Sequence, residues 1–349
     1  MGGVLSWFAS TPLSVLVNGN VAVQYFFVLT GFLVARSVFL KPQTDRRTVA
    51  IKSVNRYFRL LPTVFAATLF TALTMVIHWQ KHLDIAGSVM NPDFLTSVNS
   101  FTPTAGNLLA NLFVLPFLRN SLYVQPFWTI RYEFFGYILC LVGCYFLRGS
   151  RWRRMGYGLA AALSMTQLSF YYIPFFLGVF VADLLYTADQ PTVLSRWYAN
   201  WIHRKWFLAL LIPVGLYFAC IPMYYTPLYA FLQSPYLPME PICALGVAIL
   251  LYVSVHLKAV RRVFAAKPLL WLGKLSYPIY AFHFPLMLSL QAWLFGLFLK
   301  TAPYDQAAVG AFLLTCLATL ILSYASWYWL ERNRNYDIRR VLARVHGKA

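Results

Sequence analysis

The chain has 349 residues, of which 60% are hydrophobic and only 11% are charged, yet its formal net charge is +19. Its lysines and arginines fall mainly into clusters between long apolar runs, at residues 36–59, 148–154, 196–205, 258–274 and 332–348. Because positive charge is retained on the cytoplasmic side during membrane insertion, we interpret these clusters as cytoplasmic loops. Nucleic acid is excluded as a partner, since no basic stripe lies on a soluble domain.

The apolar runs predict an all-α, polytopic helical membrane protein. A helical span needs about 20 mostly apolar residues, and on that criterion about nine spans are expected. The centres of these spans lie near Phe26, Phe70, Tyr137, Ala162, Val179, Ile212, Gly246, Met287 and Leu320. A further apolar run, residues 108–118, is too short to cross and predicts a re-entrant or interfacial helix.

The organisation along the chain predicts one transmembrane domain over residues 1–335, followed by a short basic tail over residues 336–349. The basic tail is expected to be cytoplasmic. An odd number of spans then places Met1 outside, so we expect a further helix upstream of it. The five cysteines stand singly in apolar runs, which is typical of small buried residues and not of a disulfide framework or a metal site.

Polar residues inside the first spans form the first candidate features. Gln24, Thr30 and Gly31 interrupt an otherwise apolar run, and a small-residue contact with another helix explains them. Arg56 and Arg59 are three residues apart, so both point one way on a helix. Paired guanidinium groups bind phosphate well, but without further context ordinary cytoplasmic charge and contact with lipid phosphates are the favoured explanation.

Glu133 lies where the third apolar run begins. Ionisable side chains are costly in lipid and often functional, so Glu133 is a candidate general acid or base, or a group that orients a sugar hydroxyl. A structural pair with Arg131 is the alternative. Trp128, five residues earlier, is either an interfacial anchor or a platform on which a sugar stacks.

His283 is the second catalytic candidate, because imidazole titrates near neutral pH. On a helix, Ser276, Tyr280 and His283 follow the spacing i, i+4, i+7 and therefore share a face. A histidine satisfied by a neighbouring helix is the alternative. Further ionisable groups near span ends are Asp183, His256 and Glu331.

Together these segments resemble the membrane-bound acyltransferase-3 family. The first two stretches are Tyr25-Phe-Phe-Val-Leu-Thr-Gly-Phe-Leu33, similar to a phenylalanine-rich second helix, and Arg56-Tyr-Phe-Arg59-Leu-Leu-Pro62, which matches an Arg-x-x-Arg-x-x-Pro element. The next is Phe127-Trp-Thr-Ile-Arg-Tyr-Glu133, which resembles a Trp-Ser/Thr-Leu/Ile-x-x-Glu element.

The last stretches complete the order expected for this family. Residues 271–283 contain Gly-x-x-Ser-Tyr-x-x-Tyr-x-x-His, where Tyr277 follows Ser276. The end reads Trp329-Leu-Glu331-Arg-Asn, with Asn333 in place of the family's usual proline. The resemblance implies ten helices with both ends cytoplasmic, no bound cofactor, and transfer of an acyl group, often acetyl from acetyl-CoA, to a hydroxyl of a carbohydrate, lipid or other acceptor.

Roles for individual residues follow from the same resemblance. Arg56 and Arg59 would bind donor phosphates, and Glu133 and Trp128 would belong to the acceptor side. The family's first helix carries an arginine and a histidine regarded as the catalytic base, and no such helix precedes Tyr25. We therefore expect either that the chain starts upstream, or that it is inactive, or that it uses His283 as its base.

Two other functions remain open on sequence alone: a transporter or lipid flippase without covalent chemistry, and a catalytically inactive membrane partner. Intramembrane polar residues and proline-broken helices suit a transporter too. Repeated halves, which are frequent in transporters, are not visible in this sequence. The expected location is the plasma (inner) membrane, with membrane lipids as neighbours and with no metal-ligand spacing in the chain.

Overall fold

The computed structural model describes residues 11, 14–15, 18–41, 44–89, 92–165, 169–186, 205–222, 227–233 and 238–332. Throughout these residues the regular elements are helices, as the apolar runs predicted. The predicted upstream start, residues 196–204 of the third basic cluster and the basic tail 336–349 lie outside the described residues.

The helices of the described chain are, in order, α2 (Gly19–Phe39), α3 (Arg46–Val76), η2 (Ala86–Ser88), α4 (Pro92–Ser97), α5 (Ala105–Phe113), α6 (Leu115–Leu118), η3 (Gln125–Phe127), α7 (Trp128–Leu147), α8 (Arg153–Leu163), η5 (Phe170–Tyr172), α9 (Ile173–Tyr186), α11 (Lys205–Ala219), η6 (Pro227–Tyr229), α12 (Met239–His256), α13 (Lys258–Phe264), α14 (Lys267–Leu286), η7 (Met287–Gln291), α15 (Ala292–Phe298), α16 (Tyr304–Ser326) and η8 (Trp327–Glu331).

Six helical stretches among the described residues are long and apolar enough to cross a membrane. They are Gly19–Phe39, Arg46–Val76, Gln125–Leu147, Met239–His256, Lys267–Phe298 and Tyr304–Glu331. Six of the predicted spans are thereby confirmed, and the fold is that of a polytopic helical membrane protein. The runs near Val179 and Ile212 form shorter apolar helices, and the run near Ala162 forms α8, which has 11 residues.

The short apolar run at residues 108–118 forms two short helices instead of a span. Helix α5 has nine residues and α6 has four, so neither reaches across a bilayer. Thr104 caps α5: its hydroxyl accepts from the Asn107 amide, while the Asn107 side chain accepts from the Thr104 amide.

The chain divides into two compact units. The first comprises Met1–Ser53 and Tyr132–Ala266, and the second comprises Val54–Arg131 and Lys267–Ala349. The first unit therefore holds α2, α8, α9, α11, α12, α13 and most of α7. The second holds most of α3, the helices between α3 and α7, and the run from α14 to η8.

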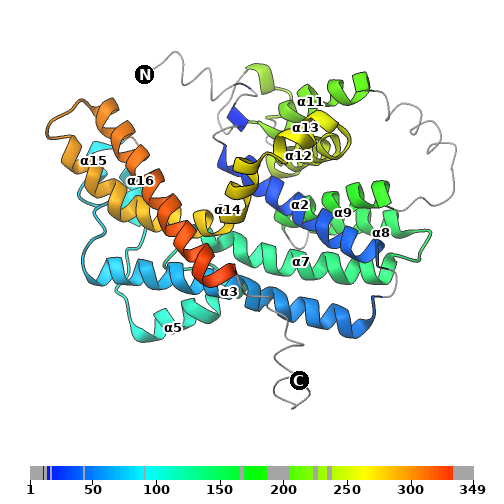
Figure 1. The fold of residues 1–349 in the computed structure, drawn as a ribbon, viewed down its shortest axis with the longest axis horizontal. Coiled ribbons are helices and arrows are strands. Elements are labelled where there is room, and N and C mark those ends of the chain that lie inside the picture. The colour runs from blue at the N-terminus through cyan, green and yellow to red at the C-terminus, as the bar shows by residue number, and fades with distance from the viewer. Residues whose placement is uncertain are drawn as a thin grey trace. The chain divides into compact units, whose positions relative to one another are not determined.

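In the first unit, α2 lies beside α9, and glycine makes their close approach possible (Figure 1). A Cβ added at Gly31 would come within 2.0 Å of the Phe175 carbonyl oxygen. A Cβ added at Gly178 would come equally close to the Val28 carbonyl oxygen. The rings of Phe27 and Phe175 stack at 4.7 Å beside this contact. The predicted small-residue helix contact at Gly31 is confirmed.

We expect Gly178→Ala to destabilise the first unit, because the added methyl group would force α2 and α9 apart. Overpacking of this kind costs about 1–3 kcal/mol. Gly143→Ala is the matched control, since its Cβ would meet nothing within 4 Å and alanine favours a helix. Thermal unfolding of the purified protein in detergent compares the two. A Gly178→Ala melting temperature equal to that of the parent would contradict this packing.

In the second unit, α14 continues through the π-helical turn η7 into α15, and α16 then packs against α14 and α15 (Figure 1). Pro278 and Pro285 lie inside α14, and Pro285 is near its end, just before η7 begins at Met287. Proline removes a backbone donor and bends a helix, so a local change of helical geometry is expected here.

One expectation about the cysteines is wrong. Cys140, Cys144, Cys220 and Cys243 are buried as predicted, but Cys316 on α16 is exposed. The same helix also exposes Leu313 and Leu317. An apolar run in a membrane protein needs no protein cover on its lipid side, so apolar surroundings in the sequence do not imply burial.

Candidate functional site

Glu133 is held inside the first unit. It is 1% exposed, and the Thr30 hydroxyl donates to both carboxylate oxygens, at 3.2 Å and 3.4 Å. Thr30 lies on α2, one residue before the glycine that lets α2 approach α9. The helix contact therefore also fixes the hydroxyl that holds Glu133. A buried carboxylate so placed is suited to accept hydrogen bonds or to exchange a proton.

Asp183 forms a second buried cluster in the first unit. It is fully buried on α9, and Arg153 Nε donates to its Oδ1 at 2.5 Å. Arg154 Nε donates to Oδ2 at 2.6 Å. Both carboxylate oxygens are engaged by guanidinium groups of α8, so this cluster joins α8 to α9.

The two candidate donor-binding arginines lie on α3 in the second unit, on the part of the helix that begins at Val54. This segment is helical, so Arg56 and Arg59 lie on the same side of α3, as the sequence predicted. Glu331, Arg56 and Arg59 all act electrostatically on the Tyr277 hydroxyl, and Arg59 also acts on Glu331. The structure thus brings together α3, α14 and η8 around a cluster of two cations, one carboxylate and a phenol.

Direct hydrogen bonds fix the framework of this cluster. The Tyr277 hydroxyl donates to the Leu60 carbonyl oxygen at 2.8 Å. The Thr63 hydroxyl donates to Glu331 Oε1 at 2.7 Å. The tyrosine and the carboxylate are each tied to α3, which carries the arginines. Arg59 itself is exposed, so its guanidinium is accessible to an anion.

The other half of the α14 motif contacts the segment that precedes α7. Tyr280 OH and Thr129 Oγ1 are 2.5 Å apart, and the Tyr280 hydroxyl also donates to the Pro126 carbonyl oxygen. Trp128 precedes Thr129 in sequence, so the predicted acceptor-side tryptophan belongs to the segment that Tyr280 holds.

His283 lies one turn beyond Tyr280, and its side chain is exposed at the protein surface. Its Nδ1 is 2.7 Å from the Tyr280 carbonyl oxygen, which can only accept. Nδ1 therefore carries the proton in the neutral ring, and Nε2 has a free lone pair. Ser276 is also exposed, and its hydroxyl donates to the Gly273 carbonyl oxygen at 2.9 Å.

The structure brings most, but not all, of the predicted site residues into one unit. The second unit holds Arg56, Arg59, Trp128, Ser276, Tyr277, Tyr280 and His283. Glu133 belongs to the first unit. Their catalytic and binding roles stay predictions.

The sequence analysis missed the polar partners that hold these residues and one further network. The Asn111 side chain donates to Ser121 Oγ at 3.2 Å and to Thr68 Oγ1 at 3.4 Å, and accepts from the Leu122 amide at 2.7 Å. A buried asparagine inside the apolar run 108–118 was the available signal. Among the partners, Thr63 carried no such signal, since threonine is common in membrane helices, whereas Thr129 occupies the Ser/Thr position of the Trp-Ser/Thr-Leu/Ile-x-x-Glu element.

The fold is that of a multi-pass helical membrane protein. Its spans carry clusters of ionisable residues, which in membrane proteins usually mark a functional site. The acyltransferase domain family Acyl_transf_3 matches residues 2–328, so the chain belongs to the membrane acyltransferase-3 family. Neither a search of curated proteins nor a search of solved structures returned a match.

Proposed function

We propose that this membrane acyltransferase moves an acyl group, acetyl in the first instance, from acyl-CoA to a hydroxyl of a carbohydrate, lipid or other acceptor. The observation that carries the proposal is the family match over residues 2–328, which spans the motif segments around Thr30, Arg56, Glu133 and His283. No resident cofactor takes part, and acyl-CoA is a co-substrate.

The cluster around Arg56 and Arg59 is the proposed donor site. Coenzyme A carries several phosphate charges, and guanidinium groups bind phosphate with paired, charge-assisted hydrogen bonds. The Tyr277 hydroxyl and Glu331 are fastened to α3, which supports the arginines from the adjoining helices. Phosphate binding at this site requires the donor to arrive from the side of the basic loops, which we propose to be the cytoplasm.

His283 is the proposed base. An acceptor hydroxyl is a poor nucleophile near pH 7, so a base must remove its proton as the oxygen attacks the thioester carbonyl. The Nε2 lone pair takes that proton, the new C–O bond forms, and the C–S bond breaks. The proton then goes to the departing thiolate, giving an ester and free coenzyme A.

Acceptor-side roles are proposed for Glu133 with Thr30 in the first unit and, separately, for Trp128 in the second unit. A buried carboxylate held by a hydroxyl is suited to orient an acceptor hydroxyl through a hydrogen bond. The indole offers an apolar face on which a sugar ring stacks. Ser276 and Tyr280 complete the polar face that His283 shares on α14. The protein is proposed to lie in the plasma (inner) membrane with its C-terminus in the cytoplasm.

Release of coenzyme A distinguishes an acyltransferase from a transporter. The purified full chain is placed in vesicles made from total membrane lipid extract, with acetyl-labelled acetyl-CoA and soluble carbohydrate added outside. We expect free thiol to appear together with label in a product that mild base hydrolyses. Movement of labelled carbohydrate or lipid across the vesicle without thiol release would reject this proposal and favour transport.

We expect Arg59→Gln to raise the KM for acetyl-CoA about 10–100-fold with a smaller change in kcat, because a hydrogen bond to a charged group contributes roughly 1.5–3 kcal/mol. Arg59→Lys keeps the charge but loses the paired hydrogen-bond geometry, so its KM should lie between those of the parent and of Arg59→Gln. Arg262→Gln on α13 removes the same charge from an exposed basic helix and serves as the control. An equal rise in KM for both Gln variants would show a general charge effect and no site.

A further inference from the structure

A cavity of about 290 Å³ lies in the second unit. It is bounded by η7, α15, the beginning of α16 and the segment between α3 and α5. Three alanines create the space: Ala292 on α15, and Ala308 and Ala311 on α16. Ala308 and Ala311 are three residues apart and therefore share one face of the helix.

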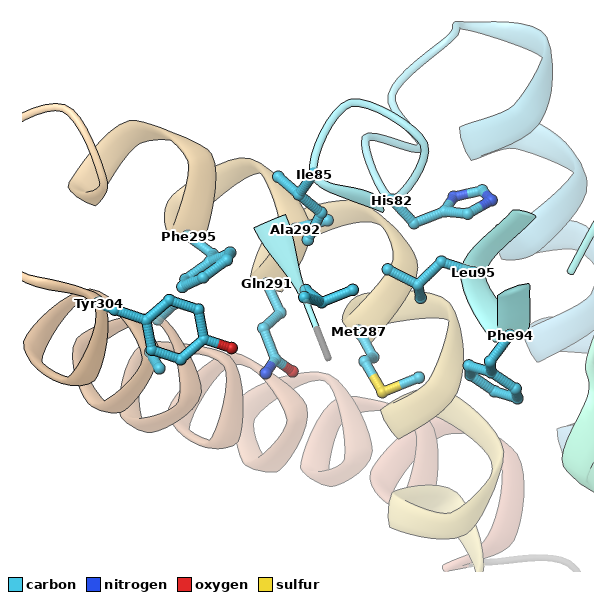
Figure 2. Close-up of a pocket in the computed structure, with 12 residues that line it drawn as sticks. His82, Ile85, Phe94, Leu95, Met287, Gln291, Ala292, Phe295 and Tyr304 are labelled. Carbon is cyan, nitrogen blue, oxygen red and sulfur yellow. The ribbon is translucent and has the colours of Figure 1, made fainter. Parts of the chain in front are cut away.

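The walls are almost entirely apolar. The apolar lining includes Ile85, Val89, Phe94, Leu95, Met287 and Phe295. The remaining polar side chains are His82, Gln291 and Tyr304. Figure 2 shows the Gln291 amide and the Tyr304 hydroxyl directed toward the same part of the cavity, near Met287. Tyr304 is 40% exposed, so this end of the cavity is accessible from outside the protein.

The segment that closes the cavity is fastened by hydrogen bonds. The Lys81 amide donates to the Leu288 carbonyl oxygen at 3.0 Å, which ties the segment to the π-helical turn. His82 Nε2 donates to the Val98 carbonyl oxygen at 3.3 Å. The Asn99 side chain donates to Gln80 Oε1 at 3.1 Å. The part of the wall formed by residues 80–82 is therefore preformed.

The chemistry of the walls selects the ligand. Burial holds the pKa of His82 below its ordinary value, so His82 is neutral at pH 7 and the lining carries no charge. An ionic ligand would lack a counter-charge, and a sugar would lack partners for most of its hydroxyls. Apolar cavities exclude water. A flexible apolar chain with one polar end fits this arrangement of an apolar body and an amide–phenol mouth.

We propose that this cavity binds a single alkyl chain of an amphipathic lipid, with the polar end of the lipid at Gln291 and Tyr304. A water molecule occupies about 30 Å³ in the liquid and a methylene is of similar size, so the cavity takes a segment of roughly ten carbons. The π-helical turn supports the proposal, because such turns are frequent at functional sites and this one supplies Met287 and Gln291. Binding of this lipid is a function beyond the proposed acyl transfer.

Photocrosslinking tests this site on the full chain in phosphatidylcholine vesicles. One arm adds a free fatty acid with a diazirine in mid-chain, and the other adds phosphatidylcholine bearing the same chain. We expect crosslinks on Met287 and Phe295 in at least one arm, which identifies the lipid as single-chain or diacyl. We also expect excess oleate to compete at these residues and not at lipid-facing Leu313, which is 60% exposed.

Ala308→Trp fills the cavity and should lower crosslinking at Met287 at least tenfold. Val309→Trp is the matched control, because Val309 is the next residue of α16 and is 57% exposed. Ala308→Leu serves if the tryptophan variant does not fold. Crosslinking of Met287 that oleate does not reduce, or equal labelling in the Ala308 and Val309 variants, would overturn the proposal. The readout involves no acyl transfer, so its failure leaves the enzymatic proposal untouched.

Discussion

Replacement of His283 by alanine is expected to lower the rate of acyl transfer by about 10²–10⁴-fold, the usual contribution of a positioned base. The hydrogen bond from Nδ1 to the Tyr280 carbonyl oxygen leaves Nε2 as the only basic atom of the ring. Loss of that atom should reduce kcat and leave the KM for acetyl-CoA nearly unchanged, because the proposed donor contacts lie on α3. Initial rates of thiol release at varied acetyl-CoA concentration separate the two constants.

His256→Ala is the matched control for this prediction. His256 ends α12 in the first unit, and its Nδ1 also contacts the carbonyl oxygen of an earlier turn, that of Tyr252, at 2.9 Å. The two histidines thus share a backbone contact but differ in neighbours. A His283→Ala variant with full activity would reject His283 as the base. An equal loss in both variants would indicate structural damage and would also reject it.

Replacement of Asp183 by alanine is expected to destabilise the protein by about 3–5 kcal/mol, because it leaves buried positive charge without a counter-charge. Arg153 is 8% exposed and cannot regain full hydration, whereas Arg154 is 45% exposed and can turn to solvent. The expected loss of stability is therefore nearer about 3 kcal/mol than about 5 kcal/mol. Thermal unfolding in detergent, followed by loss of monomeric protein on gel filtration, measures it.

Asp84→Ala provides the contrast for Asp183. Asp84 pairs with Lys81 at 3.6 Å, with side-chain exposures of 65% and 40%. Exposed pairs contribute about 0–1 kcal/mol, so the melting temperature should hardly move. If both aspartate variants unfolded at the same temperature, the buried cluster would not hold α8 to α9 as the distances indicate.

The long helices could be predicted from the sequence because the membrane imposes one length and one composition on every span. The described helices near Ala162, Val179 and Ile212 are shorter than that length. A serial count of apolar residues does not distinguish a span from a shorter apolar helix that packs within the protein. The prediction that Cys316 is buried was wrong for a related reason. Lipid and the protein interior are both apolar, so an apolar sequence does not show which of the two a side chain contacts.

The candidate site was predictable in its residues but not in its pairs. Ionisable side chains are energetically costly inside a membrane, and this identified Glu133, Asp183 and His283 individually as candidates. Their partners lie far away in sequence: Thr30 holds Glu133 across 103 residues. Such pairs depend on which helices become neighbours, and no periodicity in a single sequence encodes that. The hydrogen bonds of the Tyr280 hydroxyl and the alanine-lined cavity could not be predicted for the same reason.

The glycine contact between α2 and α9 can form only after both helices have been synthesised, and they are far apart in the sequence. At about 5–20 residues per second, the roughly 150 residues between Gly31 and Gly178 take on the order of ten seconds to synthesise. During that interval α2 is already made, yet the helix that covers its narrow face does not exist. The nascent α2 must wait beside lipid or an insertion factor, with Thr30 facing surroundings that offer it no carboxylate.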